Sequence, residues 1–278
     1  MKELYDDVCH KMSKLTTQSY STSFSLGTRF LGPSVRQPIY ALYGFVRFAD
    51  EIVDSFHDFD KQYLLDKFKS DTNEAIDQGI SLNPILNSFQ KAVHDFKIDR
   101  TLIDTFLESM EMDLNQTQYS QEAYEKYILG SAEVVGLMCL KIFVNKDAVL
   151  YQKLEFSAMR LGSAFQKINF LRDLKADFNG MGRTYFPGVD LDNFDETTKK
   201  GIEADILKDF QDGYEGILQL PKEARFGVYM AYVYFFRLFK KIERTPAHQI
   251  LKQRIRIPNQ QKYALFVGSL VRHQLNLL

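Results

Sequence analysis

The sequence predicts an all-α protein, and three observations support this fold class. Apolar residues recur at helical spacing through nearly the whole chain. Alternating apolar and polar runs bounded by Gly or Pro, which are typical of strands, are hard to find. The 278 residues are 45% hydrophobic and 26% charged, which suits a globular protein with a large core and excludes disorder, collagen and coiled coil as the dominant state.

Glycine and proline predict where the helices end along the chain. The breaks fall at Gly32-Pro33, at Gly79 with Asn83-Pro84, at Gly180 to Gly182, at Pro187-Gly188, and at Pro221, Pro246 and Pro258. They predict about ten or more helices. The stretch from Asn179 to Thr198, rich in Gly, Asp, Asn and Thr, is expected to be the least ordered. None of the breaks is a long polar linker, so residues 1–278 are expected to form one domain.

Charge, cysteine content and hydropathy narrow the class of protein. The 35 Lys plus Arg and 36 Asp plus Glu give a net charge of -1, which offers nucleic acid no particular attraction. Cys9 and Cys139 lie far apart, so neither a disulfide framework nor a zinc site is indicated. The longest apolar run, Gly227 to Phe236, is shorter than the roughly 18 residues that span a bilayer. We therefore expect a cytoplasmic protein without a membrane anchor.

An acidic pair lies in the first of two otherwise apolar segments. Asp50 and Asp54 are four residues apart in the segment 40–54, so a helix places them on one face about one turn apart. Arg47 precedes them by three and seven residues and shares that face. The segment therefore predicts a core helix that carries two carboxylates beside an arginine.

The segment 161–177 repeats this pattern. Asp173 and Asp177 form a second pair four residues apart, and Gln166 and Asn169 precede Asp173 by seven and four residues on the same face. Buried carboxylates need a compensating charge, and Mg²⁺ supplies one because it binds carboxylates together with substrate phosphates. The alternative is that each pair is solvated or bound to neighbouring Arg or Lys. Two such pairs, each beside an arginine, favour a metal cluster around a diphosphate.

At these segments the sequence resembles the squalene and phytoene synthases, which join two prenyl diphosphates head to head. Asp50 to Asp54 is similar to the family's first aspartate-rich motif, and Asn169 to Phe178 is similar to the second. Three further segments also match: Tyr20 to Phe24, Tyr127 to Gly136 and Gly182 to Pro187. The resemblance implies the isoprenoid synthase fold, a helical bundle around a large central cavity.

The resemblance also implies a set of site residues. Mg²⁺, with Mn²⁺ as an alternative, would be held by Asp50, Asp54, Asn169, Asp173 and Asp177, with Arg47 and Arg172 completing the catalytic set. The expected substrate-binding residues are Ser21, Ser23, Phe24, Tyr43, Tyr127, Gln166, Asn169, Arg183, Tyr185, Arg254 and Lys262. One departure is Phe235, which stands where relatives commonly carry a pocket Tyr, with Tyr234 beside it.

Some of these segments have a plain structural interpretation as well. Ser21 and Ser23 could simply cap a helix, and the small residues Gly130 and Gly136 permit either close helix packing or room for a ligand. The basic run from Arg237 to Lys262 is usually a solvated helix face, but it could also contact anionic lipid where a long hydrocarbon product leaves.

The expected function is condensation of two geranylgeranyl diphosphates to phytoene. Within the same chemistry, the alternative is a squalene or dehydrosqualene synthase that uses farnesyl diphosphate. A chain-elongating prenyl synthase is disfavoured because Asp50-Glu51 lacks a doubled Asp. An alternative of another class is a non-catalytic helical assembly or binding factor. The sequence shows no glycine-rich fingerprint for binding a dinucleotide such as NADPH. This favours phytoene as the product, because formation of squalene requires a reductant and formation of phytoene does not.

Overall fold

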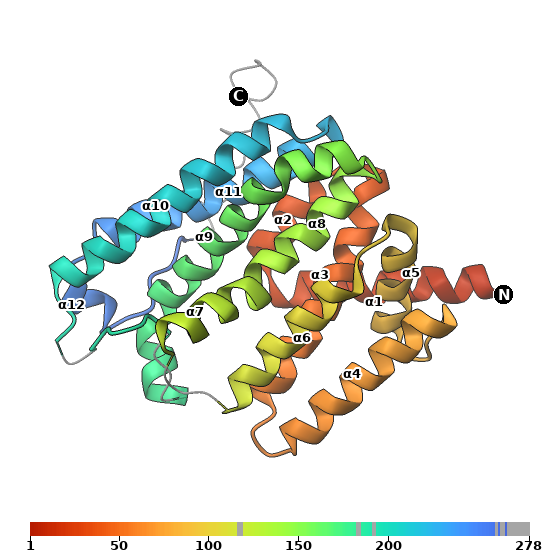
Figure 1. Ribbon diagram of the computed structural model, residues 1–278, viewed down its shortest axis with the longest axis horizontal. Helices are drawn as coiled ribbons and strands as arrows, with labels where there is room; N and C mark the ends of the chain where they lie inside the picture. Colours follow the sequence, from red (N-terminus) through yellow and green to blue (C-terminus); the bar gives the residue numbers. More distant parts are fainter. Residues whose placement is uncertain (116–118, 182–184, 191–192, 259–260, 262–264, 266–278) are drawn as a thin grey trace.

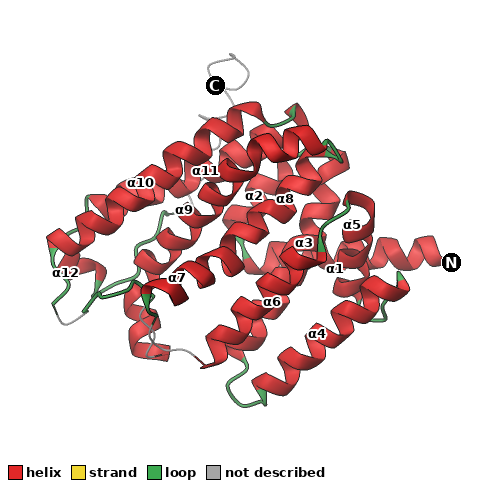
Figure 2. Ribbon diagram, viewed as in Figure 1, coloured by secondary structure: helices red, strands yellow, loops and turns green. Residues whose placement is uncertain are grey.

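The computed structural model is a bundle of helices that pack side by side, with the N-terminal end of α1 projecting from one side (Figures 1 and 2). It describes residues 1–115, 119–181, 185–190, 193–258, 261 and 265, without the side chains of residues 175–181. Every regular element within these ranges is helical, so the all-α prediction is confirmed. The single domain stays a prediction.

The helices follow one another with short connections. They are α1 (Lys2–Tyr20), α2 (Thr22–Arg29), α3 (Pro33–Ser55), α4 (Lys61–Gln78), α5 (Pro84–Phe96), α6 (Arg100–Asn115), α7 (Gln121–Ile128), the π-helical turn η1 (Leu129–Glu133), α8 (Val134–Val144), α9 (Ala148–Met181), α10 (Glu196–Gln219), α11 (Lys222–Glu243) and α12 (Ala247–Ile250).

Several helix boundaries lie where Gly and Pro predict them. Pro33 is the first residue of α3, where its missing N–H costs nothing. Gly79 ends α4 in the left-handed conformation at φ 68°, which favours glycine. Asn83 caps α5, because its side-chain oxygen accepts hydrogen bonds from the backbone N–H groups of Ile85 at 3.0 Å and Leu86 at 3.4 Å.

The stretch from Asn179 to Thr198, expected to be the least ordered, is helical at both ends, and α9 ends at Met181, within the break predicted at Gly180 to Gly182. Helix α9 continues through Gly180 to Met181, because one glycine costs a helix only about 1 kcal/mol and does not by itself end it. At the other end, the Asp195 side chain accepts a hydrogen bond from the backbone N–H of Thr198 at 2.8 Å, so α10 begins at Glu196.

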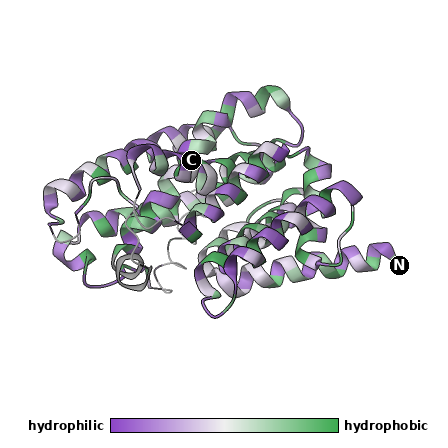
Figure 3. Ribbon diagram, turned by 60° about the horizontal axis from the view of Figure 1, so that its bottom comes forward, coloured by the Kyte–Doolittle hydropathy of each residue, from purple (hydrophilic) through white to green (hydrophobic). Residues whose placement is uncertain are grey.

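Two hydrophobic clusters form most of the core. One joins α3, α4, α5, α6 and α8 around Phe45, whose ring stacks on that of Phe89 at 3.8 Å between centroids. The other joins α7, α9, α10 and α11 around Phe210 and Phe239. Hydrophilic and hydrophobic residues alternate along most helices, as expected of amphipathic helices packed in a bundle (Figure 3).

The stretch Gln121–Val144, from α7 to α8, is long and apolar enough to cross a membrane by length and composition alone, and 61% of its most apolar window is buried inside the protein. Glu133 and Lys141 interrupt the apolar residues of this stretch, so no uninterrupted apolar run in it is as long as Gly227 to Phe236. A buried core helix passes the same test, so the finding is weak evidence for a membrane span.

Candidate active site

The first acidic pair lies on α3, where Arg47 contacts its neighbours. The Arg47 Nη1 donates a hydrogen bond to Asp50 Oδ2 at 2.5 Å, and the same guanidinium pairs with Glu51. The Arg47 guanidinium also lies 4.4 Å from the centroid of the Tyr20 ring. The prediction that Arg47 shares a helix face with Asp50 is therefore confirmed, and Arg47 contacts both Asp50 and Glu51.

The surroundings of Asp50 disfavour its negative charge. Burial, followed by repulsion from Asp54, raises the pKa of Asp50 to about 7, although Arg47 opposes the shift. The Asp113 carboxylate, on α6, contributes a further increase. About a third of the Asp50 side chain (36%) is nevertheless exposed, so a cation from solvent can reach it.

The second acidic pair lies near the end of α9. Arg172 clamps Asp173 with Nε to Oδ1 at 3.0 Å and Nη2 to Oδ2 at 2.5 Å. Arg254 reaches the same carboxylate from beyond α12, with Nε 2.6 Å from Oδ1. The side chain of Asp177 lies outside the described residues. The structure thus brings Asp173, Arg172 and Arg254 together, while their catalytic roles stay predictions.

A buried carboxylate on α6 that sequence reasoning missed is Asp113. It accepts hydrogen bonds from the phenols of Tyr127 at 2.7 Å, Tyr185 at 3.3 Å and Tyr119 at 3.4 Å. A signal for it exists in the sequence, because residues 103, 106, 107 and 110 of α6 are all buried and position 113 continues that stripe. An acid on a buried stripe is unusual and marks a candidate site.

Asp113 links the two acidic helices at one end of the bundle. It influences Asp50 on α3, and Tyr185, which it binds, stacks on Phe170 of α9 at 3.9 Å between ring centroids. Phe170 precedes Asp173 by three residues. We call Asp50, Asp54 and Asp173 the acidic rim, and Asp113 is buried between the two helices that carry it.

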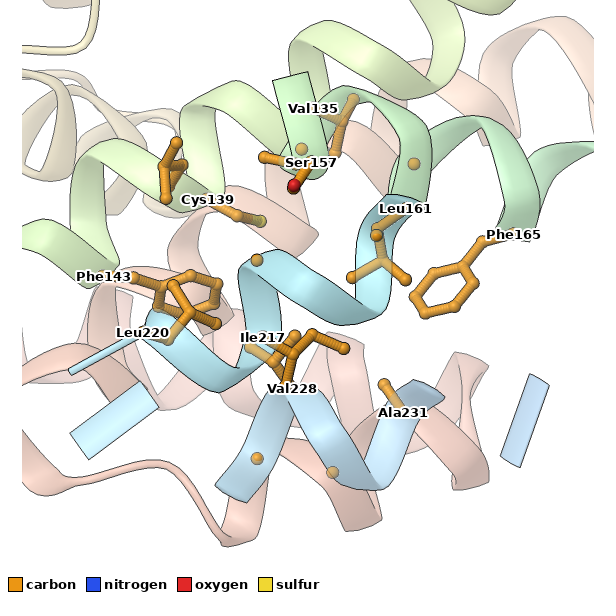
Figure 4. Close-up of a pocket in the computed structure, with 18 of the residues that line it drawn as sticks. Val135, Cys139, Phe143, Ser157, Leu161, Phe165, Ile217, Leu220, Val228 and Ala231 are labelled. Atoms are coloured by element: carbon orange, nitrogen blue, oxygen red, sulfur yellow. The ribbon is translucent and has the colours of Figure 1, made fainter. Parts of the chain in front are cut away.

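An apolar pocket of about 260 Å³ leads away from this end of the bundle, between α2, α8, α9, α10 and α11. Its lining includes Phe24, Gln166, Phe165, Cys139 and Phe143. In Figure 4 the ring of Phe165 lies at one end of the pocket, and Phe143 and Leu220 lie at the other.

The helical register orients the pocket. On α9, pocket residues run from Gln166 back to Leu154, away from Asp173. Along η1 and α8 they run from Ser131, one turn after Tyr127, to Phe143. On both helices the lining leads away from the acidic rim to an apolar end that includes Leu154 and Phe143, which we call the pocket floor.

The middle segment, Tyr127 to Gly136, holds its helices unusually close. A Cβ added to Gly130 would lie 2.7 Å from the Thr105 carbonyl oxygen, and one added to Gly136 would lie 2.7 Å from that of Ala158. Close helix packing therefore accounts for both glycines, and Gly136 also lines the pocket. The π-helical turn η1 lies in this segment, and such turns frequently occur at functional sites.

The predicted substrate-binding residues near α2 have distinct surroundings. The Ser21 hydroxyl accepts a hydrogen bond from the Phe24 backbone N–H at 3.2 Å, so it caps α2 as its plain interpretation predicts. Ser23 lies half-buried in the first turn of that helix. The Phe24 ring lines the pocket and stacks on Tyr43 at 4.5 Å between centroids. Burial raises the pKa of Tyr43, so its phenol stays protonated.

Of the other predicted substrate-binding residues, some lie within the part of the chain that the structure describes and others lie outside it. Gln166 lines the pocket, and its Nε2 donates to the Ser131 hydroxyl at 3.4 Å, while Asn169 Nδ2 donates to Gln166 at 3.5 Å. Arg183 and Lys262 lie outside the described residues. Phe235 stacks on the pocket residue Phe165 at 4.1 Å between centroids, so a ring without a hydroxyl lies beside the pocket there.

Several basic residues of the run from Arg237 to Lys262 bind partners within the protein. Lys240 pairs with Glu243 at 2.9 Å, and Lys241 donates to the Arg256 carbonyl oxygen at 2.6 Å. Arg254 binds the acidic rim. Contact with a lipid surface through this run stays a prediction.

A second cluster of charges, also missed from the sequence, lies between η1, α9 and α10. Glu133 binds Arg160 and accepts a hydrogen bond from Ser163 at 2.6 Å, and Lys167 lies 2.7 Å from Asp209. We call these five residues the ion network. The pKa of Asp209 is raised, because the effect of burial exceeds the opposing effect of the hydrogen bond from Lys167.

The acidic rim fits a divalent cation that a substrate shares. No group of three or more His, Cys, Asp or Glu within the described ranges could hold a metal ion by itself. Mg²⁺ commonly binds one or two carboxylates plus substrate phosphates, so carboxylates divided between two helices suit a metal bridged by diphosphate. The raised pKa of Asp50 agrees, because a nearby cation would offset the burial and the repulsion from Asp54 that raise it.

Comparison with known proteins identifies the family. The model of the squalene/phytoene synthase family matches residues 17–261. A phytoene synthase of Arthrospira platensis is 27% identical over 285 residues, covering 91% of this chain and 89% of that protein. A 4,4'-diapophytoene synthase of Staphylococcus haemolyticus is 26% identical over 206 residues, covering 72% of this chain and 68% of that protein.

A solved structure shows the same fold. The crystal structure of a dehydrosqualene synthase in complex with ligand superposes with a TM-score of 0.81 at 18% identity, covering 97% of this chain and 98% of that chain. The fold is therefore the all-α isoprenoid synthase fold, as the resemblance implied. The chain belongs to the squalene/phytoene synthase family, whose members are prenyltransferases that act on prenyl diphosphates and depend on divalent metals.

Proposed function

We propose that this protein condenses two geranylgeranyl diphosphates head to head to give phytoene. The observation that carries the proposal is the apolar pocket, whose lining runs from Gln166 and Ser131, at the end nearer the acidic rim, to Phe143. A prenyl diphosphate has the same division, with a charged head that suits the rim and a hydrocarbon tail that suits the pocket.

The rim residues would bind and orient the diphosphates. Mg²⁺ held by Asp50, Asp54, Asn169, Asp173 and Asp177 would neutralise the leaving diphosphate. Arg47 and Arg172 lie beside these acids and would donate hydrogen bonds to phosphate oxygens, for which the planar guanidinium is well suited. Arg254 would do the same from the opposite segment.

The proposed reaction proceeds in two stages. The C–O bond of one substrate breaks and diphosphate leaves. The double bond of the second substrate then attacks the allylic cation, and loss of a proton closes a cyclopropyl ring. Loss of the second diphosphate, rearrangement and loss of another proton give phytoene. Overall, two substrates yield one hydrocarbon, two diphosphates and two protons, and no reductant is needed.

The pocket lining would keep water from the cation. Phe24, Phe165 and Tyr43 surround the pocket entrance with rings, whose faces attract positive charge without forming a bond. We expect the hydrocarbon product to leave into a membrane through peripheral contact of this protein with a lipid surface.

Farnesyl diphosphate is the second candidate substrate, giving dehydrosqualene, or squalene where NADPH supplies hydride. The similarity to a 4,4'-diapophytoene synthase supports this alternative. Incubation with labelled C15 and C20 diphosphates and Mg²⁺, with and without NADPH, followed by identification of the hydrocarbon, distinguishes the candidates. Greater turnover of the C15 substrate, or a strong rise in yield with NADPH, would overturn the assignment to phytoene. Absence of diphosphate release would instead favour a non-catalytic binding factor.

The pocket floor provides a second test of substrate length. Phe143→Ala removes a ring from the floor and is expected to raise turnover of C20 relative to C15 substrate by about several-fold, since a methylene in an apolar pocket contributes about 1 kcal/mol. Phe59→Ala, at a ring that is 68% exposed, is the matched control. An unchanged substrate ratio in Phe143→Ala would show that the tail does not reach this floor.

A further inference from the structure

We propose that Asp113 is a positioning residue: it holds three tyrosine rings beside the reacting carbons and provides negative charge that these rings separate from the carbocation. The inference rests on the proposed head-to-head reaction. It concerns Asp113, whose buried carboxylate has no role in the proposed binding of metal and diphosphate.

The three phenols converge on one carboxylate from different parts of the chain. Tyr119 precedes α7, Tyr127 lies on α7, and Tyr185 follows α9, yet all three hydroxyls donate to Asp113. Their ring centroids are each 5.2 Å from one another, so the rings form a nearly equilateral triangle. Asp113 itself is only 6% exposed.

The direction of these hydrogen bonds determines which groups of the tyrosines remain available for contact with a substrate. Burial, and then the charge of Asp113, raises the pKa of Tyr127 well above its usual value, so the phenol remains a donor. Because its proton is committed to Asp113, the groups left for other contacts are the ring faces and an oxygen lone pair. Ring faces attract cations, and a carboxylate close behind them strengthens the negative potential.

The cluster lies where the substrate's first carbons would be. Tyr127 is one turn before the pocket residue Ser131, whose hydroxyl donates to the Tyr127 carbonyl oxygen at 2.8 Å. On the opposite side, Tyr185 stacks on Phe170, which lies between the pocket residue Gln166 and the rim residue Asp173. The cluster therefore lies between the start of the pocket and the acidic rim.

This placement suits carbocation chemistry. An allylic cation that touches water forms a C–O bond and, after losing a proton, ends as a prenyl alcohol. A carboxylate in contact would capture it as an ester. Asp113 avoids contact because it is buried behind the rings, but its charge still stabilises a cation through a medium of low dielectric.

The test compares Asp113→Asn with the wild type. This nearly isosteric change removes the charge and is expected to lower hydrocarbon turnover by at least about tenfold, with KM and the Mg²⁺ requirement within about threefold. The fraction of substrate released as prenyl alcohol should rise. Tyr127→Phe, which keeps the ring and removes its bond to Asp113, should lower turnover less, and it carries the test if Asp113→Asn does not fold.

Asp209→Asn is the matched control, since it also removes a buried carboxylate, 3% exposed, on another helix. It should lower the melting temperature without raising the alcohol fraction. Near-ultraviolet circular dichroism gives a readout independent of activity, because the chain has 15 Tyr and no Trp. Asp113→Asn should change this tyrosine signal while the far-ultraviolet helix signal stays constant.

The outcomes are separable. If wild-type protein releases no diphosphate from any prenyl substrate, the proposed function fails, and the tyrosine signal still tests whether Asp113 positions the rings. If the wild type is active but Asp113→Asn matches it in turnover, alcohol fraction and tyrosine signal, the positioning role is overturned. A rise in alcohol in Asp209→Asn equal to that in Asp113→Asn would also overturn it.

Discussion

The acidic rim and the ion network contain the same kinds of side chains in opposite surroundings. In the ion network, Glu133, Lys167 and Asp209 have side chains no more than 8% exposed, and each has a partner of opposite charge. At the rim, the Asp50 side chain is 36% exposed and that of Asp173 is 18% exposed, and Arg254, which binds Asp173, is 45% exposed. The pKa of Asp50 rises to about 7 even with Arg47 beside it.

This difference separates a structural cluster from a binding one. Buried charges that are paired with charges of opposite sign hold α9 against η1 and α10. Carboxylates that repel one another and are partly exposed, as Asp50 is, are available to bind an added cation. The surroundings of a charged cluster, rather than its composition, therefore indicate its role.

The largest effect is expected at the rim. Asp50→Asn and Asp173→Asn should each lower diphosphate release by at least about 1,000-fold, which corresponds to about 4 kcal/mol of transition-state stabilisation. Each change is nearly isosteric, so the far-ultraviolet circular dichroism and the cooperative melt should persist. Retained turnover with Mg²⁺ in both variants would refute the metal assignment.

The ion network should respond in stability instead. Lys167→Met leaves the buried Asp209 without its nearest cation and should lower the free energy of unfolding by about 3 kcal/mol, with normal turnover per folded molecule. Arg254→Met is the counterpart beside the rim, where a partly exposed ion pair contributes about 1 kcal/mol to stability. Its turnover should fall while its denaturation midpoint hardly moves. Equal loss of stability in both variants would contradict the comparison.

Binding of Mg²⁺ should depend on pH through Asp50. Because protons compete with the metal below the pKa of about 7, the apparent Mg²⁺ dissociation constant should rise about tenfold between pH 8 and pH 6. Titration calorimetry with a non-hydrolysable diphosphate analogue measures this change. Asp50→Asn should remove most of this dependence; a wild-type dissociation constant that is constant over this range would exclude Asp50 as the titrating ligand.

The smallest effect concerns the metal-free protein. Since the pKa of Asp50 is higher in the folded state than its usual 3.8, stability should be full below about pH 4 and decline as pH rises through about 7. At pH 8 without metal, Asp50→Asn should therefore be more stable than the wild type, by about 1 kcal/mol after allowance for solvent screening. Chemical denaturation at pH 5 and pH 8 measures the change, and a less stable variant at pH 8 would contradict it.

Local features were the predictable part of this molecule. Helix ends at Pro33 and Gly79 follow from backbone chemistry, and the spacing of Asp50 and Asp54 fixes their common face. The Asp113 cluster was not predictable in this way, because its tyrosines come from three separate segments of the chain. Glu133 and Arg160 are likewise 27 residues apart, and only packing brings them together.

Helix α9 has a consequence for how product length can diverge among such enzymes. It is a single rod of 34 residues, about 51 Å long, that carries the rim at one end and the pocket wall along its middle. A rigid rod works as a ruler: side chains facing the pocket recur about every 5.4 Å, close to the span of one five-carbon unit. Enlarging or trimming one such side chain should change the accepted tail by a whole isoprene unit, while the chemistry at the rim remains unchanged.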